Sequence, residues 1–236
     1  MNISVKRIQA IFMKDYKEFS RNYVISSVVL MPLVLALFYG RMGSNSIDMY
    51  FLPLNVTLSM VTTYVQACLI AEEKERNTLR GLMMSPASTF DILFGKSLLV
   101  FLMTAIILAV SCYLVGFAPE QIIVIALALA LSTAFYLALG TICGLFTKSI
   151  MEASLAVLPV MIIFTFGPLA LALGEDHLLY KIVEVLPSTQ LIRLAELSQA
   201  NAAFTELIGA FSIITAWTAG AIAISVVLFN KRTKDL

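Results

Sequence analysis

Long apolar stretches, each bounded by charged residues, dominate the pattern of this chain. Six of them contain no Asp, Glu, Lys, Arg or His: residues 23–39, 52–71, 98–115, 122–146, 153–173 and 207–229. Each is close to the roughly 17–25 residues that a helix needs to cross about 30 Å of hydrocarbon. Helices are expected because a segment in lipid must satisfy its backbone hydrogen bonds internally, and the runs lack the alternation of β-barrel strands. The pattern predicts an all-α polytopic membrane protein with six transmembrane helices.

Composition agrees with this pattern. Hydrophobic residues make up 60% of the 236 residues and charged residues only 13%, whereas a soluble domain has about 25% charged residues. This deficit excludes a water-soluble protein. The chain shows no internal repeat and no soluble insertion, so residues 1–236 are expected to form a single transmembrane domain.

The lysines and arginines predict the orientation. With the amino terminus inside, 13 of them fall on the inner side and only Arg41, Lys181 and Arg193 on the outer side. This bias follows the positive-inside rule, and six spans return the basic carboxyl tail to the same side. We therefore expect a cell-membrane protein with both termini in the cytoplasm. We also expect the first span to stay uncleaved, because its charged lead-in exceeds twenty residues and no small-x-small site follows it.

The lead-in, residues 1–22, has its own pattern. Apolar residues recur at helical spacing, while most basic residues fall on other faces; the apolar set is Val5, Ile8, Phe12, Tyr16 and Phe19. This predicts an amphipathic helix lying in the cytoplasmic interface. The alternative is a plain helical extension of the first span.

The outer connection, residues 174–206, is the longest on its side and mixes acidic residues with apolar patches. Pro187-Ser188-Thr189 predicts a break followed by a helix start, with Ser or Thr capping the free amides. We expect two short helices here, dipping into or resting on the outer interface.

The sequence lacks the residues that several kinds of chemistry require. Spans without ionisable residues disfavour an ion- or proton-coupled pump, so any uphill transport would draw on another polypeptide. Gly95-Lys96-Ser97 lacks the glycine that a phosphate-binding loop needs five residues earlier. His177 is the only histidine, and Cys68, Cys112 and Cys143 each stand alone in an apolar run. We predict no catalytic, metal-binding or cofactor-binding residues, and a net charge of +1 gives no reason to expect nucleic acid as a partner.

The connection after the second span, residues 72–97, is the strongest feature. Dense charge begins where the apolar run ends, and Leu79, Leu82 and Met83 then form a small apolar face at helical spacing that Ser85-Pro86 terminates. A charged helix with a small apolar face of this kind can dock in a groove of a cytoplasmic partner. The alternative is an ordinary charged loop. The candidate coupling residues are Glu72, Glu73, Glu75, Arg76, Thr78, Leu79, Arg80, Leu82, Met83, Ser85 and Pro86.

On these residues the chain resembles the membrane subunits, or permeases, of ABC type-2 exporters. Their hallmark is a Glu-rich segment after the second span, then Gly-Thr, Leu, a short apolar stretch and Pro. Glu72, Glu75-Arg76, Thr78-Leu79, Leu82 and Ser85-Pro86 match that order. Asn77 replaces the usual glycine, and asparagine is the residue that next best tolerates left-handed geometry. The resemblance extends over the whole chain.

The resemblance implies a homodimer that binds two cytoplasmic ABC ATPase subunits, with ATP and Mg on those partners and no cofactor in this chain. Residues 72–86 would form the coupling helix, and the interfacial helix would make a second contact. The substrate path would lie at the dimer interface, lined by the first, second and fifth spans.

The second span also carries a polar stripe on one side: Asn55, Ser59, Thr62, Thr63 and Gln66. Polar side chains avoid hydrocarbon, so this stripe should line either a pathway or a contact between helices. Pro159, Gly167 and Pro168 permit bending of the fifth span. Gly140 and Gly144, in a G-x-x-x-G pattern, would permit close helix approach in the fourth.

These observations favour the transmembrane subunit of an ATP-driven exporter that has no catalytic site of its own. Its substrate would be a drug, an antimicrobial peptide or a lipid-like molecule. A large polysaccharide is disfavoured, because aromatic residues do not gather on the polar stripe. Two alternatives stay open: a non-transporting membrane scaffold or immunity protein that recruits a cytoplasmic partner, and a passive channel. Export follows only from the resemblance, since the spans carry no direction.

Overall fold

The protein is a bundle of long helices, seen in a computed structural model that describes residues 5–43, 46–78, 81, 88–174 and 178–234. The described residues contain no β-strand, as the sequence predicted. The helices are α1 (Val5–Arg21), α2 (Tyr23–Ser27), α3 (Leu30–Met42), α4 (Ile47–Val56), the π-helical η1 (Thr57–Thr62), α5 (Thr63–Glu75), α7 (Thr89–Val115), α8 (Ile122–Phe146), α9 (Ile150–Phe166), the 3₁₀ segment η2 (Gly167–Leu173), α10 (Leu178–Glu184), α11 (Pro187–Gln199) and α12 (Phe204–Lys234).

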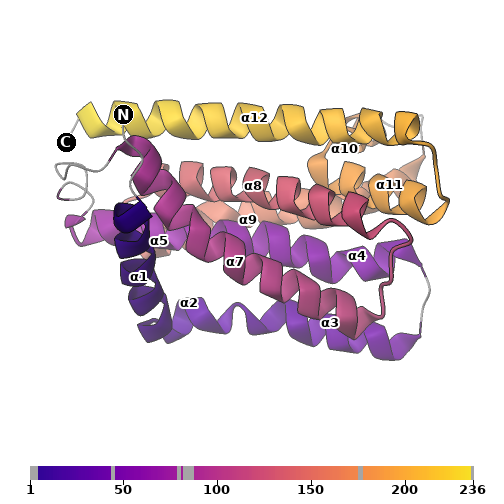
Figure 1. The fold of residues 1–236 in the computed structure, drawn as a ribbon, viewed down its shortest axis with the longest axis horizontal. Helices are drawn as coiled ribbons and strands as arrows, with labels where there is room; N and C mark the ends of the chain where they lie inside the picture. The colour runs from indigo at the N-terminus through magenta and orange to yellow at the C-terminus, as the bar shows by residue number, and fades with distance from the viewer. Residues whose placement is uncertain (1–4, 44–45, 79–80, 82–87, 175–177, 235–236) are drawn as a thin grey trace.

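Six helical segments are long and apolar enough to span a membrane, which confirms the predicted number. They are Ile25–Met42, Ile47–Glu75, Phe90–Val115, Ile122–Phe146, Ile150–Ala172 and Thr205–Lys231. Both termini and α1 lie at one end of the bundle, together with the end of α5, the start of α7 and the α8–α9 turn (Figure 1). We call this the basic end, because most of the lysines and arginines gather there.

Several helices extend beyond the uncharged runs, because polar residues cap them. Ser88 accepts a hydrogen bond from the Asp91 amide and the Asp91 carboxylate accepts one from the Ser88 amide, which forms a complete capping box at the start of α7. The helix that begins there includes Lys96. The connection after the second span therefore covers residues 76–88 rather than the predicted 72–97. Charge is absent from the apolar runs but not from the helices that contain them.

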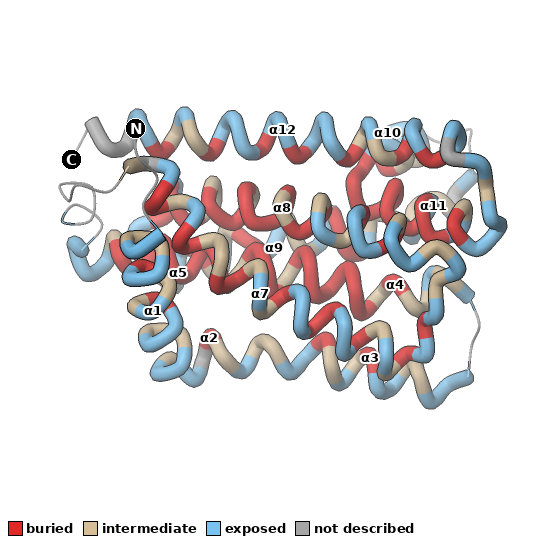
Figure 2. Tube along the Cα trace, viewed as in Figure 1, coloured by how far each residue is buried: buried red, intermediate tan, exposed pale blue. Residues whose placement is uncertain are grey.

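The second span is the core of the bundle. Of its most apolar stretch, 89% is buried, against 17% for the first span and 22% for the fifth and sixth (Figure 2). It packs against α8, where a side chain added at Gly140 would meet the Thr63 carbonyl oxygen at 2.6 Å. One added at Gly144 would meet the Ala67 carbonyl oxygen at 2.7 Å. The G-x-x-x-G pattern therefore does mark a close helix approach.

Helix α1 crosses the basic end roughly at right angles to the spans (Figure 1). Its apolar residues Val5 and Tyr16 face outward, 76% and 51% exposed. Ile11 and Asp15 are the residues of this helix that are buried against the bundle. The helix thus lies across the bundle instead of extending the first span, and its inner face contains a carboxylate that its apolar pattern does not reveal.

The predicted pair of short helices between the fifth and sixth spans is present as α10 and α11. Helix α11 starts at Pro187, as expected, but Leu186 is its N-cap and no side chain caps it. The predicted Ser or Thr cap is therefore wrong: the Ser188 and Thr189 side chains are buried in the first turn instead. Helix α11 packs against α4, α8 and α12, so it inserts among the spans.

The fifth span changes helix type where the sequence predicted bending. Helix α9 ends at Phe166, and the 3₁₀ segment begins with Gly167 and Pro168; Pro159 lies within α9 on an exposed face. The three cysteines are free thiols on separate helices, with Cys68 buried and Cys112 and Cys143 half-buried.

Candidate coupling site

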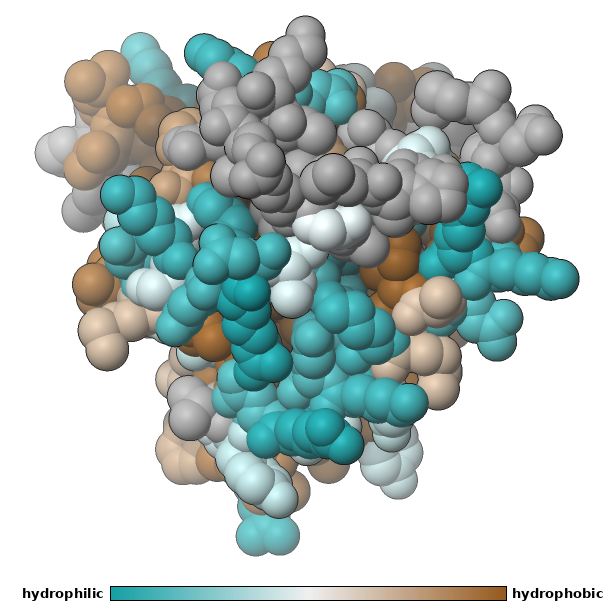
Figure 3. All heavy atoms as spheres, turned by 90° about the vertical axis from the view of Figure 1, so that its left-hand side faces the viewer, coloured by the Kyte–Doolittle hydropathy of each residue, from teal (hydrophilic) through white to brown (hydrophobic). Residues whose placement is uncertain are grey.

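The last turn of α5 is a cluster of charged residues at the basic end. Glu72 and Glu73 are only 3% and 1% exposed even though both are carboxylates. Glu72 pairs with Arg76, one turn later, with 2.6 Å between Oε1 and the guanidinium. Hydrophilic side chains cover much of the end face around this turn (Figure 3).

Glu73 joins α5 to two other helices through a buried ion network. Its carboxylate lies 2.9 Å from the Lys96 Nζ of α7 and also pairs with Lys14 of α1. Lys96, itself 1% exposed, lies 3.4 Å from the fully buried Asp15 of α1. Removing such charges from water is costly, and only mutual pairing of this kind offsets the cost. The network therefore holds α1 against α5 and α7.

The charges in this network influence one another's ionisation. Burial raises the pKa of Asp15 and outweighs the opposing effect of Lys96. Burial alone would lower the pKa of Lys14, but Glu73, Asp15 and Glu18 together raise it above its usual value. Lys14 therefore stays protonated.

Three carboxylates at this point could also suit a cation. Oxygens of Asp15, Glu18 and Glu73 lie within 4.8 Å of one another. The Lys14 ammonium forms ion pairs with all three, at 3.8 Å to Asp15 and 3.5 Å to Glu18. Two protein cations, Lys14 and Lys96, thus already pair with this cluster, and we assign no metal to it.

The next two residues of α5 hold the turn between α8 and α9. Lys74 Nζ donates to the carbonyl oxygens of Leu145, at 2.7 Å, and Thr147, where α8 ends. Glu75 Oε2 accepts from the Ile150 amide, at 3.0 Å, where α9 begins. A cation at a helix C-terminus and an anion at an N-terminus both find free backbone groups and a favourable helix dipole.

One turn of α5 is therefore bonded to α1, α7, α8 and α9 by consecutive side chains. This arrangement can transmit a displacement of the end of α5 to four helices at once.

The structure describes part of the predicted coupling segment, residues 72–86. Glu72, Glu73, Glu75 and Arg76 lie in the α5 turn, and the Thr78 hydroxyl donates to the Glu73 carbonyl at 3.3 Å. Asn77 has φ +56°, the left-handed geometry expected where the family pattern has glycine. The remaining candidates lie outside the described residues: Leu79, Arg80, Leu82, Met83, Ser85 and Pro86.

The polar stripe of the second span lies inside the bundle. Asn55, Ser59, Thr62, Thr63 and Gln66 are all buried. Three of them bond to side chains on neighbouring helices: Ser59 to Thr165 at 2.5 Å, Thr62 to Thr104 at 2.8 Å, and Gln66 to Thr141 at 3.1 Å. In the single chain the stripe is thus a contact among four spans, and the π-helical η1 lies within it.

Sequence reasoning missed three residues of the site: Asp15, Lys74 and Lys96. Asp15 carried a usable signal, since it lies four residues after Ile11 and four before Phe19, in line with apolar residues of a mostly basic helix. The uncharged run begins after Lys96, so hydropathy alone predicts a loop there. Lys74 adds to the inner-side charge bias, and nothing in the sequence shows that it reaches the end of α8.

Comparison with known families agrees with the geometry. The family described as "ABC-2 family transporter protein" matches residues 2–229. No curated protein matches the chain. Six apolar helices and a match over nearly the whole length lead to one conclusion. The chain belongs to the ABC-2 transporter family, as a multi-pass permease subunit of a kind that works with an ABC ATPase.

Proposed function

We propose that this chain forms the membrane pathway of an ATP-driven exporter whose ATP and Mg bind a separate cytoplasmic ATPase. The basic end faces the cytoplasm of a cell membrane, so both termini lie inside. The ATPase docks on residues 72–86 and also touches α1. The substrate class is a drug, an antimicrobial peptide or a lipid-like molecule.

The last turn of α5 is the observation that carries this proposal. Its side chains bond α1, α7, α8 and α9, and α5 continues into the most buried span. ATP-driven movement of a docked partner would therefore displace the core of the bundle rather than an isolated loop. A scaffold that only recruits a partner has no need of such bonding.

The proposal includes a homodimer. One apolar cluster contains Ile25 of the first span, Val61 and Val65 of the second, and Ala153 and Val157 of the fifth. The outer faces of the first and fifth spans are largely exposed in the single chain. A second copy on these faces would complete a path between the two subunits, next to the second span.

The test is ATPase activity of the complex purified through a tag on this chain. Glu72→Ala breaks the pair with Arg76, and Leu82→Asp places a charge on the predicted docking face. Both substitutions should lower the ATPase activity severalfold. The control Glu120→Ala removes an exposed carboxylate at the opposite end and should keep wild-type activity. Unchanged activity in both variants would contradict the coupling assignment, and binding without nucleotide-dependent change would favour a scaffold.

A further inference from the structure

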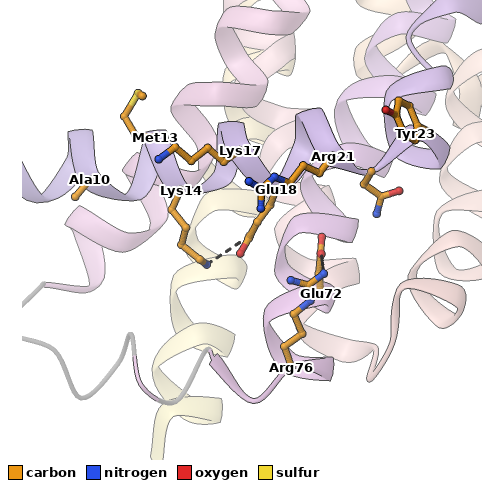
Figure 4. A pocket seen from close by; sticks show the side chains of 10 residues that line it. Ala10, Met13, Lys14, Lys17, Glu18, Arg21, Tyr23, Glu72 and Arg76 are labelled. Carbon is orange, nitrogen blue, oxygen red and sulfur yellow. Dashed lines mark ion pairs between the residues drawn. The ribbon is translucent and has the colours of Figure 1, made fainter.

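A cavity of about 730 Å³ lies between α1 and the last turn of α5 (Figure 4). Its α1 wall is the face that carries Lys14, Lys17, Glu18 and Arg21, and its opposite wall carries Glu72 and Arg76. A volume of this size accommodates a small organic ligand or a headgroup. The ion network of Glu73, Lys96 and Asp15 does not fill it.

The lining has a surplus of two positive charges, because four cations face two carboxylates. Both carboxylates are already engaged, Glu72 with Arg76 at 2.6 Å and Glu18 with Lys14 at 3.5 Å. Lys17 and Arg21 form no ion pair with any residue in the described part of the chain. They lie one helical turn apart on the same wall, where Figure 4 shows the Lys17 amine toward Met13 and the Arg21 guanidinium near Glu18.

The position of the cavity indicates where that anion comes from. Asn22 and Tyr23 line the cavity at the point where α1 turns into the first span. Tyr23 is 84% exposed and Tyr16 51%, as expected for aromatic side chains at a membrane interface. The cationic wall therefore lies at headgroup depth, beside the apolar surface along which acyl chains would run. Basic pockets on the cytoplasmic side of membrane proteins bind anionic headgroups.

We propose that this cavity binds the phosphate headgroup of an anionic membrane phospholipid. Lys17 and Arg21 donate to the phosphate oxygens, and Arg76 contributes a third cation from α5. The bound lipid would bridge α1 and the end of α5. The site rests on the proposed orientation, with the basic end at the cytoplasmic interface, but it needs no ATPase.

The test measures lipid retention by the purified chain in detergent that contains equal amounts of phosphatidylglycerol and phosphatidylcholine. Native mass spectrometry counts the lipids bound. The double variant Lys17→Gln/Arg21→Gln removes the two donors, and Lys6→Gln/Lys148→Gln removes two exposed cations at the same end but outside the cavity. All four side chains are at the surface, so both variants should elute and melt like the wild type.

We expect the wild type and the control to retain phosphatidylglycerol in preference to phosphatidylcholine. Lys17→Gln/Arg21→Gln should weaken that retention at least about tenfold, since each hydrogen bond to a charged group is worth that much alone. Equal loss in both double variants, or equal retention of the two lipids, would overturn the proposal. Displacement of the lipid by inorganic phosphate at low concentration would indicate a soluble anion and would also overturn the proposal.

Discussion

Lys96 is the residue on which the buried network depends most. It is 1% exposed and lies 2.9 Å from Glu73 and 3.4 Å from Asp15, on two different helices. Lys96→Met keeps the length of the side chain and its apolar stem but removes the charge. Two buried carboxylates then face each other with only Lys14 to neutralise them.

The expected cost follows from this geometry. Removing one partner of a buried ion pair costs about 3–5 kcal/mol, because the remaining charge stays desolvated. Lys14 still pairs with both carboxylates and is partly exposed, so the lower figure applies. In a chain of this size, about 3 kcal/mol lowers Tm by roughly 6–12 °C.

Thermal unfolding followed by size-exclusion chromatography in detergent measures this shift. The control is Lys148→Met, which removes an exposed lysine at the same end and should leave Tm unchanged. Adding Asp15→Asn to Lys96→Met should recover part of the loss, because it removes one of the stranded carboxylates. If Lys96→Met melts with the wild type, or if the second substitution deepens the loss, the network does not hold α1 as described.

Gly140→Ala should cost about 1–3 kcal/mol in Tm measurements, since its methyl group would meet backbone, while Gly220→Ala, with open space, should not; equal melting would refute the close approach. Because burial raises the pKa of Asp15, the folded state binds that proton more tightly than the unfolded chain. The Tm advantage of the wild type over Asp15→Asn should therefore grow as pH falls toward 3.8, and a shrinking advantage would contradict the shift. Lys74→Met should speed amide exchange in the α8–α9 turn, and unchanged exchange would show that Lys74 does not hold it.

The spans were predictable because the bilayer imposes a simple rule on sequence. A helix must be apolar over about 30 Å, and six runs met that length. Their ends were less accurate, because local capping rather than hydropathy decides where a helix starts. Ser88 and Asp91 begin α7 nine residues before the predicted apolar run, and so Lys96 lies inside a helix.

The site was only partly predictable, because its contacts join residues far apart in sequence. The charge density of residues 72–76 was visible, but not which helix each side chain reaches. The polar stripe of the second span could be recognised from its period of three to four residues. Its partners Thr104, Thr141 and Thr165 could not, since single threonines are common in apolar helices and only the packing selects these three.

The central claim is that an ATPase contacts this chain at the end of the second span. A photo-crosslinking residue at Thr78, which is exposed just beyond α5, tests it directly in native membranes. The same residue at Glu120, exposed at the opposite end, is the control. We expect a covalent adduct with an ATPase subunit from Thr78 and none from Glu120. No adduct from Thr78, or equal adducts from both positions, would contradict it.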